Sequence, residues 1–128
     1  MPLVRIDLRR GKPAAYRKAI CDGIYRAMRE SFEVPEDDRF MVVNEHDADS
    51  FVYAKSYLGI SHTDDLILIQ ITANDTRTVE QKQAFFAKIA VLLSENPGVC
   101  KEDIFINLVE VKKENWSFGN GIAQYVGR

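Results

Sequence analysis

The sequence has no long uninterrupted apolar segment. Nowhere does it contain the roughly 18 consecutive apolar residues that a membrane-spanning helix needs, so no membrane partner is expected. Residues 1–10 alternate charged and apolar side chains, a pattern that also argues against a signal peptide. With neither kind of segment, the sequence predicts a cytoplasmic protein.

Cysteine and histidine are scarce. The chain has two cysteines, Cys21 and Cys100, and two histidines, His46 and His62. Neither cysteine belongs to a CxxC pair or a Cys/His cluster, and neither histidine has a cysteine or carboxylate at a spacing typical of metal ligands. We therefore predict reduced thiols and no metal site.

Charge of one sign is not in large excess. The 128 residues include 17 Lys and Arg against 19 Asp and Glu, and no basic cluster exceeds the pair Arg9 and Arg10. This balance gives no electrostatic reason to bind nucleic acid. The length and a hydrophobic content of 46% indicate one globular domain over residues 1–128.

The sequence does contain a pattern of elements that occurs twice. In the first half, period-two alternation predicts a strand from residue 3 to residue 9. Pro13 suits the first position of an amphipathic helix that ends near Phe32. After a turn at residues 34–38, the segment Arg39–Glu45 is typical of a second strand.

The second half repeats this order. The apolar run over residues 66–71 predicts a strand covered on both faces. Thr78 and Gln81 have the spacing of a capping box at the start of a second amphipathic helix, which residues 96–98 terminate. Residues 103–111 predict a further strand.

Two segments are less regular. Residues 47–63 are predicted to be a loop-rich link between the halves, with a short strand or hairpin over residues 50–57 as one interpretation. Residues 116–121 turn the chain into a short tail.

A shift of 65 residues aligns the two halves, and the matched pairs are Leu3 with Leu68, Ile6 with Ile71, Val34 with Val99, Asp38 with Asp103, Phe40 with Phe105 and Glu45 with Glu110. We therefore predict an α+β fold made of two tandem β-α-β units, residues 2–60 and 66–128. A right-handed crossover makes the strands of each unit parallel, so one four-stranded sheet should carry both helices on one face. The bare face predicts docking of subunits around a symmetry axis.

Pro2 is the first candidate for chemistry. Methionine before a small residue is normally removed, which would leave Pro2 as a free secondary amine at the start of the first strand. An apolar wall or a nearby cation lowers the pKa of such an amine from its reference value of about 7.7 to 8.0. A neutral amine near pH 7 can act as a general base.

Other candidates lie in three separate segments. Arg77 precedes the capping residue of the second helix, where it could bind a carboxylate together with unpaired helix amides; it could also be a solvated helix-start cation. Asp38 could orient water or a substrate hydroxyl, although acidic residues are common in turns. Trp116 and Phe118 could wall a dry pocket or simply pack.

Four motifs contain these candidates: Pro2-Leu3, Val34-Pro35-x-x-Asp38-Arg39, Arg77-Thr78-Val79-Glu80-Gln81-Lys82, and Asn115-Trp116-Ser117-Phe118-Gly119-x-Gly121. Together they resemble the tautomerase superfamily, specifically its malonate semialdehyde decarboxylase branch. The third motif is also similar to 4-oxalocrotonate tautomerase, whose short subunit is one β-α-β unit. This chain looks like a fusion of two such units.

The resemblance implies a role for each candidate. Pro2 would be catalytic, Asp38 its polar partner and Arg77 the anion-binding group, while Trp116 and Phe118 would form an aromatic wall. It also implies a homotrimer.

One residue departs from the pattern. The decarboxylase branch has a second arginine two residues before the one matched by Arg77, whereas this chain has Asp75. A carboxylate there would repel an anionic substrate group, which argues against decarboxylation. Arg9, Arg10 or Lys12 could supply a replacement cation.

The preferred hypothesis is a tautomerase acting on a small carboxylic acid, a 2-keto or 2-hydroxydienoate acid, with no cofactor and with Pro2 as general base. A decarboxylase or hydratase similar to malonate semialdehyde decarboxylase is the close alternative. A noncatalytic trimeric module that binds a small ligand or a protein is the alternative from another class.

Overall fold

A computed structural model describes residues 2–127, so Met1, whose removal the sequence predicts, lies outside the described residues. Its main elements are β1 (Leu3–Arg9), α1 (Ala14–Ser31), β2 (Phe40–His46), β5 (Ile67–Asn74), α2 (Val79–Glu95) and β6 (Ile104–Val111). Two short strands, β3 (Ser56–Tyr57) and β4 (Ile60–Ser61), form a hairpin between the halves. Within the described residues, no helix is long and apolar enough to cross a membrane.

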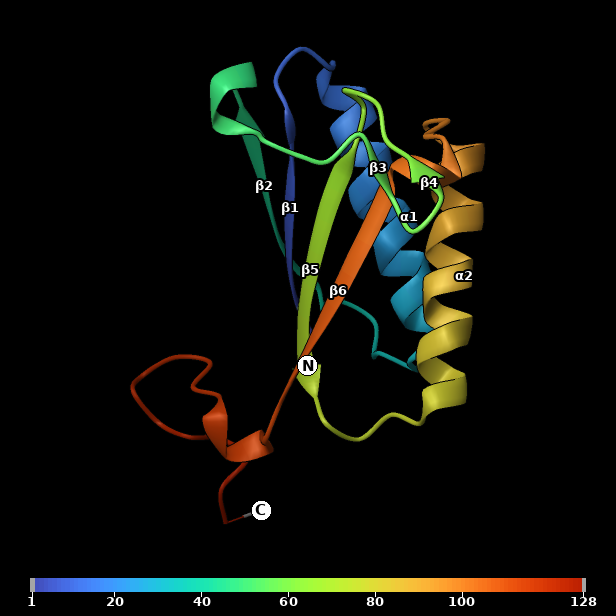
Figure 1. Cartoon of the computed structure of the whole chain (residues 1–128). Coiled ribbons are helices and arrows are strands. Elements are labelled where there is room, and N and C mark those ends of the chain that lie inside the picture. Colours follow the sequence, from blue (N-terminus) through green and yellow to red (C-terminus); the bar gives the residue numbers. More distant parts are fainter. Residues whose placement is uncertain (1, 128) are drawn as a thin grey trace.

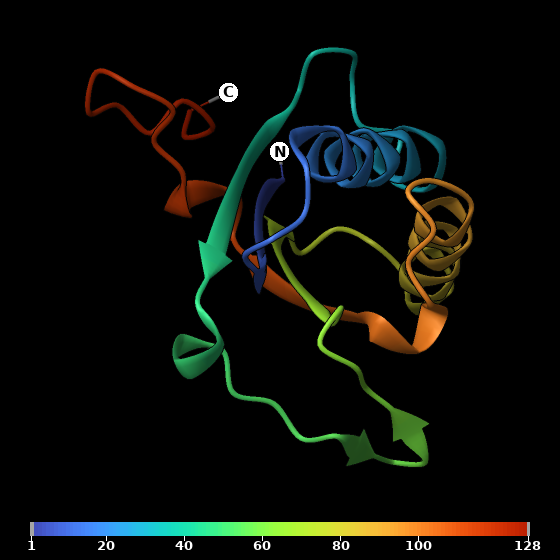
Figure 2. The same ribbon diagram turned by 90° about the horizontal axis from the view of Figure 1, so that it is seen from above.

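The four long strands form one mixed sheet in the order β2-β1-β5-β6. β1 pairs with β2 in parallel, and β5 pairs with β6 in parallel, as the sequence predicts for each β-α-β unit. The units meet at their first strands, because β1 and β5 are antiparallel neighbours. Figure 1 and Figure 2 show both helices on one face of this sheet, which confirms the predicted arrangement.

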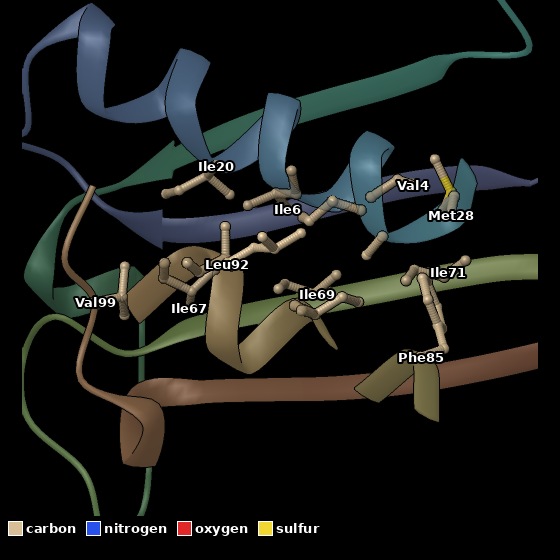
Figure 3. Close-up of a cluster of buried hydrophobic side chains, with 14 of the residues drawn as sticks. Val4, Ile6, Ile20, Met28, Ile67, Ile69, Ile71, Phe85, Leu92 and Val99 are labelled. Carbon is tan, nitrogen blue, oxygen red and sulfur yellow. The ribbon is translucent and has the colours of Figure 1, made fainter. Parts of the chain in front are cut away.

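The hydrophobic core lies between the sheet and the two helices (Figure 3). Alternate residues of the central strands point toward the helices, and they are nearly inaccessible to solvent: Val4, Ile6, Leu8, Ile67, Ile69 and Ile71. The helices approach closely at Gly23, where an added Cβ would lie 2.8 Å from Leu93 Cδ2. A larger residue at this position would push Leu93 out of a filled core.

The capping box is present at the start of α2. The Thr78 hydroxyl accepts from the Gln81 amide at 3.1 Å, and the Gln81 side chain accepts from the Thr78 amide at 2.9 Å. These two bonds fix the loop before α2, which contains Arg77.

Element boundaries differ from the sequence predictions by a few residues. Pro13 caps α1 instead of occupying its first position, since its backbone is extended. β5 continues to Asn74, three residues past the predicted end, because β6 remains paired along its whole length. The link contains a 3-10 turn at Ala48–Ser50, and the hairpin lies at residues 56–61 instead of 50–57.

Residues 2–127 place no helix on the opposite face of the sheet (Figure 2), where the link between the halves borders Leu68 and Phe105. Phe40 is 52% exposed and Phe105 is 45% exposed on the two edge strands, and Val42 is also exposed. Large apolar side chains on a bare sheet face are typical of a surface that packs against another subunit.

Candidate functional site

Pro2 is buried immediately before β1. Leu3 pairs with Phe40 on β2 and with Thr72 on β5. Extending both registers by one residue places Pro2 beside residue 39 on one side and residue 73 on the other. The turn that contains Asp38 and the end of β5 therefore flank Pro2.

Asp38 lies in a tight turn between α1 and β2. Its amide donates to the Pro35 carbonyl oxygen at 3.2 Å, and the amide of the preceding residue, Asp37, donates to the Tyr25 hydroxyl at 3.0 Å. The side-chain oxygen Oδ1 of Asp38 is buried, and it has no hydrogen-bond partner among the described residues. A buried carboxylate oxygen without a partner is costly, and such atoms are often found at functional sites.

The adjacent cation does not neutralise Asp38. Arg39 instead contacts Asp22, with 2.5 Å between Arg39 Nη2 and Asp22 Oδ1, and its guanidinium lies 4.8 Å from the centre of the Tyr25 ring. Hydrogen bonds from Arg39 and from Lys18 hold the pKa of Asp22 below its ordinary value. Contacts of the neighbouring residues thus fix the turn, while Oδ1 of Asp38 has no partner among residues 2–127.

Asp103, 65 residues after Asp38, provides an internal comparison. It is 1% exposed, and its two carboxylate oxygens accept from the Thr63 amide at 2.8 Å and from the Thr63 hydroxyl at 2.5 Å. Asp103 therefore has a structural role in holding the link to the start of β6. In the part of the chain that the structure describes, Oδ1 of Asp38 has no partner equivalent to Thr63.

Arg77 lies in the loop between β5 and α2, half-buried. Its Nη2 donates to the carbonyl oxygen of Phe32 at 3.2 Å, and its guanidinium lies 4.7 Å from the centre of the Phe32 ring. Phe32 in turn stacks on Phe85 with 4.1 Å between ring centres. The cation is thus held between the end of α1 and the start of α2, at the end of the sheet where β1 begins (Figure 1).

Asp75 shares this loop with Arg77. Its amide donates to the Val111 carbonyl oxygen at 3.1 Å, which extends the pairing of β5 with β6 by one residue. Its side chain is exposed. The loop therefore carries one cation and one anion within three residues.

Trp116 and Phe118 stack on each other, with ring centres 5.6 Å apart and planes 20° from parallel. Trp116 Nε1 donates to Asn74 Oδ1 at 2.7 Å, so the aromatic pair is tied to the end of β5. Sequence reasoning missed Asn74 because the predicted strand ended at residue 71. The hydrophobic periodicity of the sequence does not reveal that an indole N–H donates to a buried side-chain amide.

The hypothesis that Arg9, Arg10 or Lys12 supplies a replacement cation is wrong within one chain. Arg9, Arg10 and Lys12 lie at the far end of β1 from Pro2, on the order of 20 Å away at about 3.3 Å per strand residue. Each is paired with an aspartate, at 2.7 Å to Asp64, 3.1 Å to Asp47 and 2.9 Å to Asp65, respectively. They line a cavity of about 600 Å³ whose charges are balanced internally.

No group of three or more His, Cys, Asp or Glu among residues 2–127 has the geometry to hold a metal ion. Cys21 is half-buried, and burial raises the pKa of its thiol. His46 Nε2 lies 2.6 Å from Asp7 Oδ1 at the opposite end of the sheet from Pro2, and the His62 ring contacts the Ala54 carbonyl oxygen at 2.9 Å.

Comparison with known proteins gives consistent matches over nearly the whole chain. Two family models, each described as tautomerase enzyme, match residues 38–119 and residues 2–59. Probable tautomerase YusQ of Bacillus subtilis (strain 168) is 41% identical over 98% of this chain and 99% of its own. Probable tautomerase YrdN of the same strain is 32% identical over 98% and 97% of the two chains.

Solved structures give the same result. A malonate semialdehyde decarboxylase inhibited by 3-bromopropiolate is 35% identical, covers 97% of this chain and 94% of its own, and has a TM-score of 0.89. Another malonate semialdehyde decarboxylase, studied for decarboxylase and hydratase activities, is 30% identical over 95% and 94% of the chains, with a TM-score of 0.88. A fused 4-OT described as a symmetric trimer shares the fold at 22% identity and a TM-score of 0.79, over 98% and 99% of the chains.

Proposed function

This chain belongs to the tautomerase family, and from this premise we propose that it transfers a proton between oxygen and carbon of a 2-keto or 2-hydroxydienoate acid, with the amine of Pro2 as general base. Family membership makes the protein an enzyme of the tautomerase type and disfavours the noncatalytic module. The substrate class and the role of Pro2 are the parts that we propose.

The burial of Pro2 at the end of the sheet carries this proposal. Its position in the two strand registers is flanked by the turn of Asp38 and by the end of β5, from which the Arg77 loop and the Trp116 contact both depart. A carboxylate, a guanidinium and an aromatic pair therefore belong to segments at the same end of the sheet as Pro2, which supports the proposal.

The proposed reaction needs only these groups. Neutral Pro2 accepts the proton of the substrate's 2-hydroxyl group while the carbon-carbon double bond shifts to form the ketone. The protonated proline then returns the same proton to carbon, so no proton is gained or lost. Arg77 binds the substrate carboxylate, Asp38 orients the hydroxyl, and Trp116 with Phe118 excludes water.

We also propose that the chain assembles as a homotrimer through the bare face of its sheet. The exposed apolar side chains at Phe40, Val42 and Phe105 support this proposal. The symmetric trimer of the related fused 4-OT supports it through the shared fold. Assembly through this face would remove from water apolar surface that a single chain of this size leaves exposed.

Decarboxylation or hydration of a compound like malonate semialdehyde is the second candidate. The identities of 30% and 35% to malonate semialdehyde decarboxylases favour it. In that reaction Asp38 would position water and Pro2 could act as a cation. Asp75 argues against it, because it stands where the decarboxylase branch has a second arginine, and its carboxylate would repel the single substrate carboxylate that a pair of arginines would bind.

One assay separates the two candidates. Protein whose N-terminal residue is verified by mass to be Pro2 is offered the enol of phenylpyruvate and, separately, malonate semialdehyde. Loss of the enol absorbance without carbon dioxide release supports tautomerisation. Carbon dioxide release with no acceleration of ketonisation would replace the proposal with the decarboxylase.

A further inference from the structure

We infer that Asn74 is a positioning residue that holds the indole of Trp116 against the Pro2 site. This inference rests on the proposed function, since it assumes that Trp116 forms part of the substrate pocket. It adds a residue to the site that contacts neither the substrate nor the reacting atoms. Asn74 would act only through the ring that it holds.

Asn74 is placed to give a rigid anchor. It is the last residue of β5, it is 6% exposed, and its strand partner is Val111 at the end of β6. Trp116 follows β6 by five residues, after the 3-10 turn Lys113–Asn115. The hydrogen bond of 2.7 Å from Trp116 Nε1 to Asn74 Oδ1 therefore connects the C-terminal segment to the end of a central strand of the sheet.

The chemistry of the pair determines its orientation. An indole N–H can only donate, so the amide of Asn74 must present its oxygen to Trp116. A neutral leucine of similar size at this position would fill the space but accept no bond. The indole N–H would then be left without its partner, which costs free energy in a half-buried site.

Polar contacts between this segment and the body of the protein are few. Among residues 2–127, the bond from Trp116 to Asn74 is the only hydrogen bond or ion pair that links residues 112–127 to the rest of the chain. Figure 1 shows the segment projecting beyond the end of the sheet. Loss of this one bond should therefore release the whole segment.

The segment is otherwise closed on itself. The Gln124 side chain accepts from the Phe118 amide at 2.9 Å and donates to the Gly119 carbonyl oxygen at 2.9 Å. Tyr125 packs edge-on against Phe118, with 5.2 Å between ring centres. The stacked Trp116 and Phe118 rings therefore move as one unit whose location depends on Asn74.

The first test uses Trp116 as its own reporter, because it is the only tryptophan in the chain. We expect Asn74→Leu to shift tryptophan emission to longer wavelength and to increase quenching by acrylamide, with far-ultraviolet circular dichroism unchanged. Gln83→Leu, which makes an amide-to-leucine change at an exposed position on α2, should leave emission unchanged. Asn74→Asp keeps an acceptor and should retain the wild-type emission. Wild-type emission in Asn74→Leu would overturn the inference.

The second test asks whether Asn74 acts through Trp116. With the enol of phenylpyruvate as substrate, Asn74→Leu should lower kcat/KM by about 3- to 10-fold, the loss of one hydrogen bond. In a Trp116→Phe background the same change should cost less than about 2-fold, because the bond is already absent. An equal loss in both backgrounds would show that Asn74 acts by another route.

The outcomes separate this inference from the proposed function. If Trp116→Phe retains full kcat/KM, the hydrogen bond between the indole and Asn74 does not serve the site and Asn74 is a structural contact alone, which overturns the inference while Pro2 chemistry stands. If verified wild-type protein turns over no enol acid, the proposed function fails. In that case the emission test still decides whether Asn74 holds the ring. A second titration decides whether that ring serves a site: the binding of phenylpyruvate to wild type and to Asn74→Leu is measured by the quenching of tryptophan emission. Equal affinity for the two proteins would overturn the inference.

Discussion

Arg77 donates a hydrogen bond from Nη2 to the carbonyl oxygen of Phe32, and its guanidinium lies over the ring of the same residue, 4.7 Å from its centre. This pair joins the loop before α2 to the end of α1. A guanidinium carries five N–H donors, so the contact leaves donors available for a substrate carboxylate. One residue is thus expected to contribute both to stability and to binding.

Replacement of Arg77 by alanine should separate these two contributions. We expect kcat/KM for the enol of phenylpyruvate to fall by about 10- to 100-fold, because a charge-assisted contact contributes about 1.5 to 3 kcal/mol. The free energy of unfolding should fall by about 1 kcal/mol through loss of the Phe32 contacts. Steady-state kinetics and urea denaturation measure the two effects.

The methyl ester of the same enol is the control for charge. It has the same shape without the carboxylate, so Arg77→Ala should change its turnover much less. An equal loss for acid and ester would mean that Arg77 acts only on the structure of the loop.

Asp75 is expected to limit the charge of the substrate. Asp75→Arg replaces an exposed carboxylate, two residues from Arg77, with a cation. We expect Asp75→Arg to raise kcat/KM for a dicarboxylic enol acid by about 3- to 10-fold relative to kcat/KM for a monocarboxylic one. This range corresponds to a partly screened charge interaction of about 1 kcal/mol. Asp75→Asn should have a smaller effect in the same direction. No change in the ratio for either variant would place Asp75 outside the site.

Asp38 and Asp103 should respond oppositely to the same substitution. Asp38→Asn removes the charge of a carboxylate whose buried Oδ1 has no partner among residues 2–127, so the protein should be at least as stable as wild type while its turnover falls by about tenfold or more. Asp103→Asn weakens two bonds from Thr63 and should cost about 1 to 3 kcal/mol of unfolding free energy. Urea denaturation of both variants checks this. A large loss of stability in Asp38→Asn would indicate a structural role instead.

The fold was predictable because each element carries a local signal. The alternation of Val4, Ile6 and Leu8 identifies a strand, and Thr78 with Gln81 identifies a helix start, with both predicted bonds present. The order of the strands was not predictable in the same way. It depends on β1 and β5 pairing across the halves, a contact between distant residues that no local pattern specifies.

The site was predictable only in part. Pro2, Asp38, Arg77 and Trp116 were selected from motifs, and the structure places the first three at one end of the sheet, with the indole of Trp116 tied to that end through Asn74. Their roles stay predictions. What the sequence could not reveal is pairing: Arg39 contacts Asp22 and not Asp38, and Asn74 accepts a hydrogen bond from Trp116. Such partners are set by tertiary packing and not by sequence spacing.

Assembly through the bare face predicts a trimer. Light scattering should give about three times the mass of one chain, and Val42→Asp with Phe105→Asp should shift the protein toward monomer by placing charges on the interface. Val91→Asp, at a similarly exposed apolar position on α2, is the matched control and should leave the mass unchanged. A wild-type monomer at all concentrations would contradict the assembly.

The central claim is that the amine of Pro2 is the reactive group. When Met1 is retained, the nitrogen of Pro2 becomes part of a peptide bond, and its delocalised lone pair can no longer accept a proton. Proline contributes no amide hydrogen inside a chain, so retention of Met1 should leave the sheet intact. Correctly processed Pro2→Ala keeps a primary amine and should retain some activity with a shifted pH profile.

The most direct measurement compares the two forms of the N-terminus. Protein with Met1 retained and protein beginning at Pro2, each homogeneous by intact mass and folded by circular dichroism, are assayed for ketonisation of the enol of phenylpyruvate. We predict that the Met1 form loses at least about 100-fold in kcat/KM, the contribution of a general base. Equal rates for the two forms would contradict the Pro2 mechanism.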